Sequence, residues 1–342
     1  MHSFKKTFIS TLTFLLCAAF FSLILIEPYF HSEYHYYNDT KLRESMAGKI
    51  DCLILGASHA LDGFVPNVVD DILGCNCYNL SGSQLTWPGR EALLKEEISR
   101  NPVKTVILEI SYDTLCHDPY YTEGNIYLIP RLKTASERFI FTCKNVHMKD
   151  WHKVYADFLN SGFHYLFNSV FTNKNVNNVI YENKGFFQRE ATDISLSGNE
   201  IADSRNSDHL SDNYNKKNIN TLYRIVSCCK ENNIELIYVV TPVSDKIIWE
   251  LSNLSIFFQF LSDLSKETDC KLFDFNLIKE RYSVFSDKTS FYDSVHLSES
   301  GAIEFSKLFA ETLKNEKSGI GNDDNFYHSY AEMITDSPYF LY

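Results

Sequence analysis

The sequence predicts an α/β protein in which a mostly parallel sheet is covered by helices on both faces, a three-layer sandwich. Short apolar runs alternate with segments of helical periodicity, and this alternation is typical of sheets built from βαβ units. The first of these, within residues 50–55, is a short apolar run of the kind expected for a strand that is buried on both faces. The chain has 342 residues, 44% of them hydrophobic, which is enough for one large domain with an insertion.

Five apolar runs are the predicted strands. In chain order they are residues 50–55, 76–80, 104–110, 234–240 and 271–275. The carboxyl ends of parallel strands share one edge of the sheet, and open α/β sheets bind ligands beyond that edge. Polar residues that directly follow these runs are therefore the first candidates for a functional site.

Helical patterns separate the predicted strands. Pro66 suits a first helical turn and Gly74 a helix end, which predicts a short helix between them. The predicted helices are residues 66–73, 88–99, 214–231, 246–266 and 299–313. The alternation breaks at about 114–213, an aromatic and Asn-rich stretch that we interpret as an insertion over the sheet edge. Helical patches are predicted within it at 135–141 and 151–165.

An uncharged segment precedes the predicted domain. Residues 7–26 carry no charged side chain, and about 20 such residues cross a bilayer as a helix. Lys5 and Lys6 stand before the segment, so the positive-inside rule places the N-terminus in the cytoplasm. The sequence thus predicts a single-pass signal anchor in the cytoplasmic membrane, with the main domain outside the cytoplasm. Cleavage as a signal peptide near Cys17 is the alternative, but the apolar run continues past that position.

The predicted organisation has four parts. They are a cytoplasmic tip with a transmembrane anchor (1–26), a polar stalk (27–48), the α/β domain (49–314, with the insertion at about 114–213) and a C-terminal tail (315–342). The tail is polar and then aromatic, and either disorder or packing against the domain is compatible with it.

Charge and cysteine usage limit the partners. The net charge is −12, and no basic stripe or Walker-type phosphate loop is present, so nucleic acid is not an expected partner. Nine cysteines occur without a repeated disulfide framework. Cys75 and Cys77 form a Cys-x-Cys pair, but no second Cys or His pair stands at zinc spacing. The pattern favours buried thiols, and we predict no metal and no cofactor; the disulfide pairing stays open.

Residues with catalytic potential stand at two distant places. Ser58 follows the first predicted strand, and Asp293 and His296 precede the last predicted helix. Each motif alone is ambiguous, because turn serines and Asp-x-x-His loops are common. Together they supply a nucleophile, a base and a carboxylate that orients the base. Ser58 is predicted to attack an ester carbonyl. His59 is expected to pack beside it, and Ser244 to be an ordinary loop residue.

The order Ser…Asp-x-x-His resembles the SGNH/GDSL hydrolase superfamily. The resemblance covers about residues 50–113 and 234–313, and it implies an SGNH-type α/β sandwich with serine-dependent ester chemistry. Two positions depart from the family pattern: Ala57 replaces the aspartate of Gly-Asp-Ser, and Tyr112 holds an asparagine position. Both departures resemble the membrane-anchored branch, which includes the teichoic-acid D-alanyl transfer proteins and the alginate O-acetylation proteins.

The resemblance also implies an oxyanion hole, a set of donors for the negative oxygen of the intermediate. In this family the donors are the amide of the nucleophile, here Ser58, a glycine amide, here Gly82, and an asparagine side chain. Because Tyr112 holds the asparagine position, Ser111 or Tyr112 is the expected third donor.

The membrane-anchored branch implies a function. It is serine esterase or O-acyltransferase activity on acyl, above all acetyl, esters of a cell-surface glycan. The implied partners are the acylated glycan or acyl donor and a membrane-bound O-acyltransferase. A non-catalytic or weakly catalytic partner of such an acyltransferase is the alternative, and a metal-dependent hydrolase lacks ligands beyond Asp293 and His296. The acyl group, the polymer and the choice between hydrolysis and transfer stay open.

Overall fold

The computed structural model describes residues 10, 11, 13, 14, 43, 45–120, 122–154, 183–209 and 211–337. Most of the predicted membrane anchor and stalk lies outside these residues. Within the described ranges, no helix is both long and apolar enough to cross a bilayer. Arg43, in the predicted stalk, is fully buried and donates hydrogen bonds to the Glu97 carboxylate and the Arg131 carbonyl. The described end of that stretch therefore packs against the α/β domain.

Five parallel strands form the sheet, in the order β2-β1-β3-β4-β5. They are β1 (Cys52–Leu55), β2 (Cys77–Asn79), β3 (Thr105–Glu109), β4 (Glu235–Val240) and β5 (Lys271–Asp274). All five predicted strands and their parallel pairing are confirmed. The chain leaves β1 toward β2 and then returns to place β3 on the other side of β1. That switch opens a crevice at the carboxyl ends of β1 and β3.

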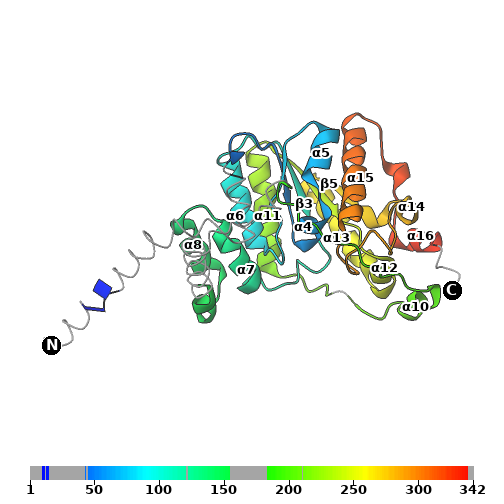
Figure 1. Ribbon diagram of the computed structural model, residues 1–342, viewed down its shortest axis with the longest axis horizontal. Coiled ribbons are helices and arrows are strands. Elements are labelled where there is room, and N and C mark those ends of the chain that lie inside the picture. Colours follow the sequence, from blue (N-terminus) through cyan, green and yellow to red (C-terminus); the bar gives the residue numbers. More distant parts are fainter. Residues whose placement is uncertain are drawn as a thin grey trace, which may run out of the picture.

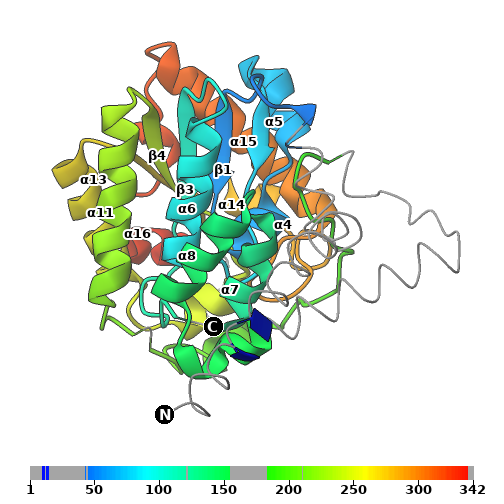
Figure 2. The same ribbon diagram turned by 90° about the vertical axis from the view of Figure 1, so that its left-hand side faces the viewer.

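Helices cover both faces of the sheet (Figure 1). One face carries α6 (Trp87–Ile98), α11 (Lys216–Glu231) and α13 (Leu254–Thr268), and the other carries α5 (Pro66–Leu73) and α15 (Glu299–Lys317). Alternate residues of each strand point to opposite faces, so the strands feed two separate apolar clusters. Leu53 and Val106 belong to the first cluster, whereas Ile54 and Ile107 belong to the second. Figure 2 shows α6 and α11 in front of the strands.

Two helices differ from the prediction. The predicted helix 246–266 is two helices, α12 (Asp245–Glu250) and α13, because Leu251 leaves the helix to form a β-bridge with Asp208 of the insertion. A short helix that was not predicted, α4 (Ser58–Gly63), follows β1 directly. Its six residues are too few for a periodic pattern to be visible in the sequence.

The insertion and the tail are partly helical. The predicted patch 151–165 lies mostly outside the described residues, while the patch at 135–141 is confirmed as α8. In the tail, the Tyr330 hydroxyl donates to Asp274 Oδ2 at 2.9 Å, and Met333 is buried, so the described tail packs against the domain. The remaining elements are α7 (Thr122–Leu128), η2 (Ile129–Arg131), α8 (Ala135–Asn145), η3 (Met148–Asp150), α10 (Gly198–Asp203), η4 (Phe275–Leu277), α14 (Arg281–Val284), η5 (Asp323–Asn325) and α16 (Tyr330–Thr335).

Candidate active site

Ser58 occupies the turn between β1 and α4. It is the first residue of α4 and follows the link Gly56-Ala57. The Ala57 N–H donates to Glu109 Oε2 at 3.1 Å, and a Cβ at Gly56 would lie only 2.6 Å from the same oxygen. Only glycine therefore allows the chain to pass so close to Glu109. Glu109 is fully buried at the end of β3 and also accepts a hydrogen bond from the Ser111 hydroxyl, so it fixes two neighbouring loops.

Asp293 and His296 lie in a closed loop before α15. A bridge between Phe291 and Leu297 closes the base of the loop. Inside it, Asp293 Oδ1 accepts the backbone N–H groups of Val295 and His296, each at 2.9 Å. These local bonds orient the Asp293 carboxylate toward the His296 ring before any contact with Ser58 is made.

The three residues form a continuous hydrogen-bonded chain. Ser58 Oγ lies 2.8 Å from His296 Nε2, and His296 Nδ1 lies 2.9 Å from Asp293 Oδ2. Partial burial raises the pKa of Asp293, but the hydrogen bonds with His296 and the Val295 N–H outweigh it, so the pKa lies below its usual value. A carboxylate that stays ionised holds Nδ1 in its protonated form and leaves Nε2 to accept a proton. The structure thus brings together the three residues that the sequence singled out as catalytic candidates.

A pocket opens beside Ser58 and His296. The loops after β1, β2 and β3 line it, together with the start of the insertion; the lining residues are 57–59, 84–87, 111–114, 117–119, Asn218, Val295 and His296. Its cavity volume of about 210 Å³ is below the ~300–1,000 Å³ typical of small-molecule sites. Such a space accommodates a short group, with the rest of a larger molecule outside.

The predicted oxyanion donors are placed unequally. The Ser58 amide lies in the first turn of α4, where N–H groups have no partner within the helix. The Gly82 N–H donates to the Gly56 carbonyl at 3.4 Å, and Gly82 does not line the pocket, whereas Gln84 of the same loop does. The two candidates for the third donor, Ser111 and Tyr112, differ in whether their hydroxyl groups already have a partner. The Ser111 hydroxyl donates to the Glu109 carboxylate.

The Tyr112 hydroxyl is the freer of the two third-donor candidates. It forms no hydrogen bond within the described part of the chain, and the residue lines the pocket. Burial raises its pKa above the usual value, so the hydroxyl keeps its proton and remains a donor. Tyr112, one of the two residues predicted as the third donor, therefore remains available for that role.

A second aspartate–histidine pair lines the same pocket and was missed in the sequence. His117 Nε2 lies 3.2 Å from Asp113 Oδ2, and about half of each side chain is exposed. The hydrogen bond with Asp113 raises the pKa of His117. Burial raises the pKa of Asp113, but the bond with His117 outweighs it and lowers the pKa overall. The spacing Asp-x-x-x-His is visible in the sequence, yet nothing there relates it to Ser58.

The lesser candidates, His59 and Ser244, lie near the site without joining the hydrogen-bonded chain. The His59 ring lies edge-on to the His296 ring, with their centroids 5.2 Å apart, and His59 lines the pocket. Ser244 is buried outside the lining, and its backbone N–H donates to the Ser294 carbonyl in the Asp293 loop. His59 is therefore a packing residue of the pocket, and Ser244 supports the loop through its backbone.

A buried carboxylate lies behind the Ser58–His296 contact. Asp62 of α4 is fully buried and accepts a hydrogen bond from Arg189 Nε at 3.1 Å. Burial raises the pKa of Asp62 to about 6, although the positive charges of Arg189 and His296 act in the opposite direction. The Arg189 guanidinium also lies over the ring of Tyr292, next to Asp293. The end of the insertion thus packs against the loop that carries the acid–base pair.

Comparison with known proteins gives little beyond this geometry. No protein-family profile and no curated protein sequence matches the chain. Among solved structures, a protein from Bacteroides fragilis described as a "putative acylhydrolase" matches with a TM-score of 0.37 and 10% sequence identity, over 80% of this chain and 93% of that chain. At this similarity the match carries no information about the activity of this chain.

Proposed function

We propose that this protein is a serine-dependent ester hydrolase or acyltransferase of SGNH type. The observation that carries the proposal is the hydrogen-bonded chain from Ser58 Oγ through His296 to Asp293, with distances of 2.8 and 2.9 Å. It supplies a nucleophile, a base with a free ring nitrogen and a carboxylate that fixes the tautomer of the base. All three are held by backbone features of the fold, namely the β1–α4 turn and the closed 291–297 loop.

The reaction proceeds in two halves. Ser58 Oγ forms a bond to the ester carbonyl carbon while His296 Nε2 takes the hydroxyl proton, and the carbonyl oxygen becomes an oxyanion. The tetrahedral intermediate then breaks its bond to the alcohol oxygen, which leaves with the proton from His296. A water molecule or a second hydroxyl attacks the acyl-Ser58 ester, and His296 accepts its proton. Return of that proton to Ser58 Oγ releases the acid or the new ester.

The finer features of the proposal rest on the sequence and the pocket. The small cavity favours a short acyl group such as acetyl. We infer from the uncharged segment 7–26 that the domain works outside the cytoplasmic membrane, on an acylated cell-surface glycan and beside a membrane-bound O-acyltransferase. Alkaline phosphatase fused after Tyr342 should be active in a bacterial host. An inactive fusion that is expressed at the same level would reject the extracytoplasmic location.

A fluorophosphonate probe tests the nucleophile directly. The wild-type chain should be labelled at Ser58 and should give a burst of nitrophenol with p-nitrophenyl acetate. Ser58→Ala should lose both signals, whereas Ser244→Ala, a nearby serine outside the pocket, should keep them. Labelling of Ser58→Ala at the wild-type level would reject the proposed nucleophile.

The second candidate function is a partner protein that presents an acylated glycan to a membrane acyltransferase without catalysing the reaction. The contact of the Gly82 N–H with the Gly56 carbonyl favours it, because that amide is then withdrawn from the oxyanion position. The probe separates the two candidates. A correctly folded wild-type chain that neither reacts with the probe nor gives a burst supports the partner function.

A further inference from the structure

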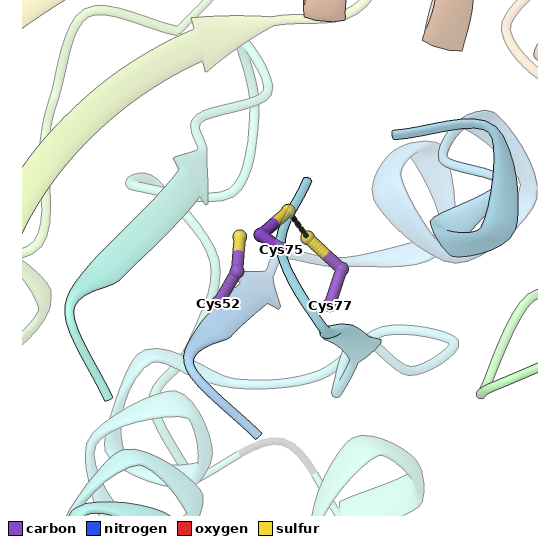
Figure 3. Close-up of side chains that lie close together, drawn as sticks. All are labelled: Cys52, Cys75 and Cys77. Atoms are coloured by element: carbon purple, nitrogen blue, oxygen red, sulfur yellow. Dashed lines mark hydrogen bonds between the residues drawn. The ribbon is translucent and has the colours of Figure 1, made fainter. Parts of the chain in front are cut away.

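Three cysteines lie close together at the end of the sheet where β1 and β2 begin (Figure 3). The Ser58 site lies at the other end, after the carboxyl end of β1. Cys52 and Cys77 open the neighbouring strands β1 and β2 and are paired in the parallel register, and Cys75 stands just before β2. The three sulfur atoms lie within 4.8 Å of one another, and Cys75 Sγ is 3.5 Å from Cys77 Sγ. The sequence favoured plain buried thiols because no second Cys or His pair at zinc spacing accompanies Cys75 and Cys77. The pairing of β1 with β2 supplies Cys52 as a third sulfur, which spacing along the chain does not indicate.

Charged groups surround Cys75 in particular. Asp70 Oδ1, from α5, lies 3.6 Å from Cys75 Sγ and accepts the Cys77 N–H at 2.6 Å. Asp70 Oδ2 forms an ion pair with Lys184 Nζ at 2.5 Å. Cys75 therefore stands beside two further thiols and a carboxylate that Lys184 neutralises.

We propose that Cys52, Cys75 and Cys77 form a binding site for a thiophilic divalent cation of the Zn²⁺ class. A tetrahedral ion about 2.3 Å from each sulfur places the sulfur atoms about 3.8 Å apart. One observed separation is 3.5 Å and none exceeds 4.8 Å, so small side-chain adjustments produce this geometry. Asp70 Oδ1, 3.6 Å from Cys75 Sγ, is an oxygen donor in place for the fourth position.

The surroundings fit such an ion. Three thiolates, the Asp70 carboxylate and one divalent cation carry a net charge of −2, which the Lys184 ammonium, paired with Asp70, reduces to −1. Binding releases the protons that the thiols carry, so affinity rises with pH. Cys52 and Cys77 are buried and Cys75 is partly exposed, so an ion has access from the Cys75 side. A closed site of this kind is structural, and it joins β1 to β2 without taking part in the Ser58 chemistry.

Metal binding to the full chain in detergent tests the proposal. The reduced, chelator-treated protein should bind about one Co²⁺ per chain, with thiolate-to-cobalt charge-transfer bands in the near ultraviolet and the visible bands of a tetrahedral ion. Zn²⁺ should displace Co²⁺ and abolish both sets of bands. It should also raise the melting temperature of the wild-type protein.

Cysteine variants locate the site. Cys75→Ser is the main variant because Cys75 is the most exposed of the three, and it should lose the charge-transfer bands and the thermal shift. The matched control is Cys143→Ser, an exposed cysteine elsewhere, which should keep both. Wild-type protein without cobalt bands, Cys75→Ser with undiminished bands, or an intact mass showing a disulfide among the three in protein purified without reductant would each overturn the proposal. The cobalt titration of the wild-type protein tests the proposal even if a variant does not fold.

Discussion

Two aspartate–histidine pairs stand at the same pocket, and they differ in which ring nitrogen faces the carboxylate. In the first pair, Asp293 contacts His296 Nδ1, and Nε2 points to Ser58 at 2.8 Å. In the second, Asp113 contacts His117 Nε2, and within the described residues no hydrogen bond joins the His117 ring to a serine, threonine or cysteine side chain. His296 is also the less exposed of the two histidines, with 20% of its side chain accessible against 55% for His117.

The difference teaches that the pair alone does not define a base. A histidine acts on a hydroxyl only if its carboxylate leaves the other nitrogen free and that nitrogen reaches the hydroxyl. In the second pair, the hydrogen bond to Asp113 raises the pKa of His117, which favours the imidazolium form. His117 is therefore suited to hold a negative or polar part of a substrate, and His296 to move a proton.

Loss of His296 should have the largest effect on turnover. His296→Gln removes the base that accepts the Ser58 proton, and in serine hydrolases such a loss costs on the order of 10⁶-fold in kcat. The rate of p-nitrophenyl acetate hydrolysis measures it, with circular dichroism as the control for folding. Turnover within tenfold of wild type would mean that the contrast between the two pairs has no catalytic meaning.

Loss of the Asp293 carboxylate should rank second. Asp293→Asn leaves the imidazole in place but without its fixed tautomer, and the corresponding change in serine hydrolases costs about 10⁴-fold in kcat. The same assay measures the change, read mainly in kcat and not in KM. If Asp293→Asn were as active as the wild type, the closed loop would have to be reinterpreted as a structural feature only.

The second pair should matter much less. His117→Gln removes a pocket-lining group that touches neither Ser58 nor His296, so kcat should change by less than about tenfold. Any larger effect should appear in KM, because His117 is placed to contact substrate. Asp113→Asn changes the other member of the pair, and its kcat should likewise differ from the wild-type value by less than about tenfold. A fall in kcat as large as that of His296→Gln would show that His117 takes part in proton transfer.

The smallest expected effect is on stability and concerns Asp62, whose carboxylate interacts with the charges of His296 and Asp293. Its pKa is raised to about 6 in the folded protein from an unfolded value of about 3.8. The protonated form is therefore the one that folding favours, and stability from this group is present below pH 4 and lost as pH rises through about 6. A difference of about two pH units corresponds to roughly 3 kcal/mol at most.

Asp62→Asn tests that linkage. The variant should gain stability relative to wild type as the pH rises from 4 to 7, measured by denaturant unfolding at each pH. Asp71→Asn is the control, since Asp71 is an exposed carboxylate on α5 whose loss should leave the pH dependence unchanged. Parallel curves for wild type and Asp62→Asn would show that Asp62 is ionised at the same pH in both states.

The sequence predicted the features that depend on local patterns. The five strands were visible because each contains a short run rich in apolar residues between helical patterns. Ser58 was visible because it follows the first strand closely, and Asp293 and His296 because they precede the last predicted helix. The split between α12 and α13 was not visible, since the apolar pattern continues through Leu251 and only its bridge to Asp208 breaks the helix.

Features that depend on strand register or on distant packing were missed for the same reason. Glu109 reads as an ordinary strand residue, and its contact with the Ala57 N–H arises only when β3 pairs with β1. Cys52 joins Cys75 and Cys77 only through the pairing of β1 with β2. Such contacts are set by three-dimensional neighbours that carry no signal in a single sequence.

The contact between Ser58 and His296 also has a consequence for how the protein folds during its synthesis. The two residues are 238 positions apart, and His296 is fixed by α15, which packs against α4 and α5 from the N-terminal region. A chain still on the ribosome that has completed β3 holds the nucleophile without its base. Because closing so long a loop carries an entropic cost, this contact forms late. The reactivity of Ser58 would therefore report when the C-terminal region docks. Before that step, Ser58 of the unfinished chain would not act as a nucleophile.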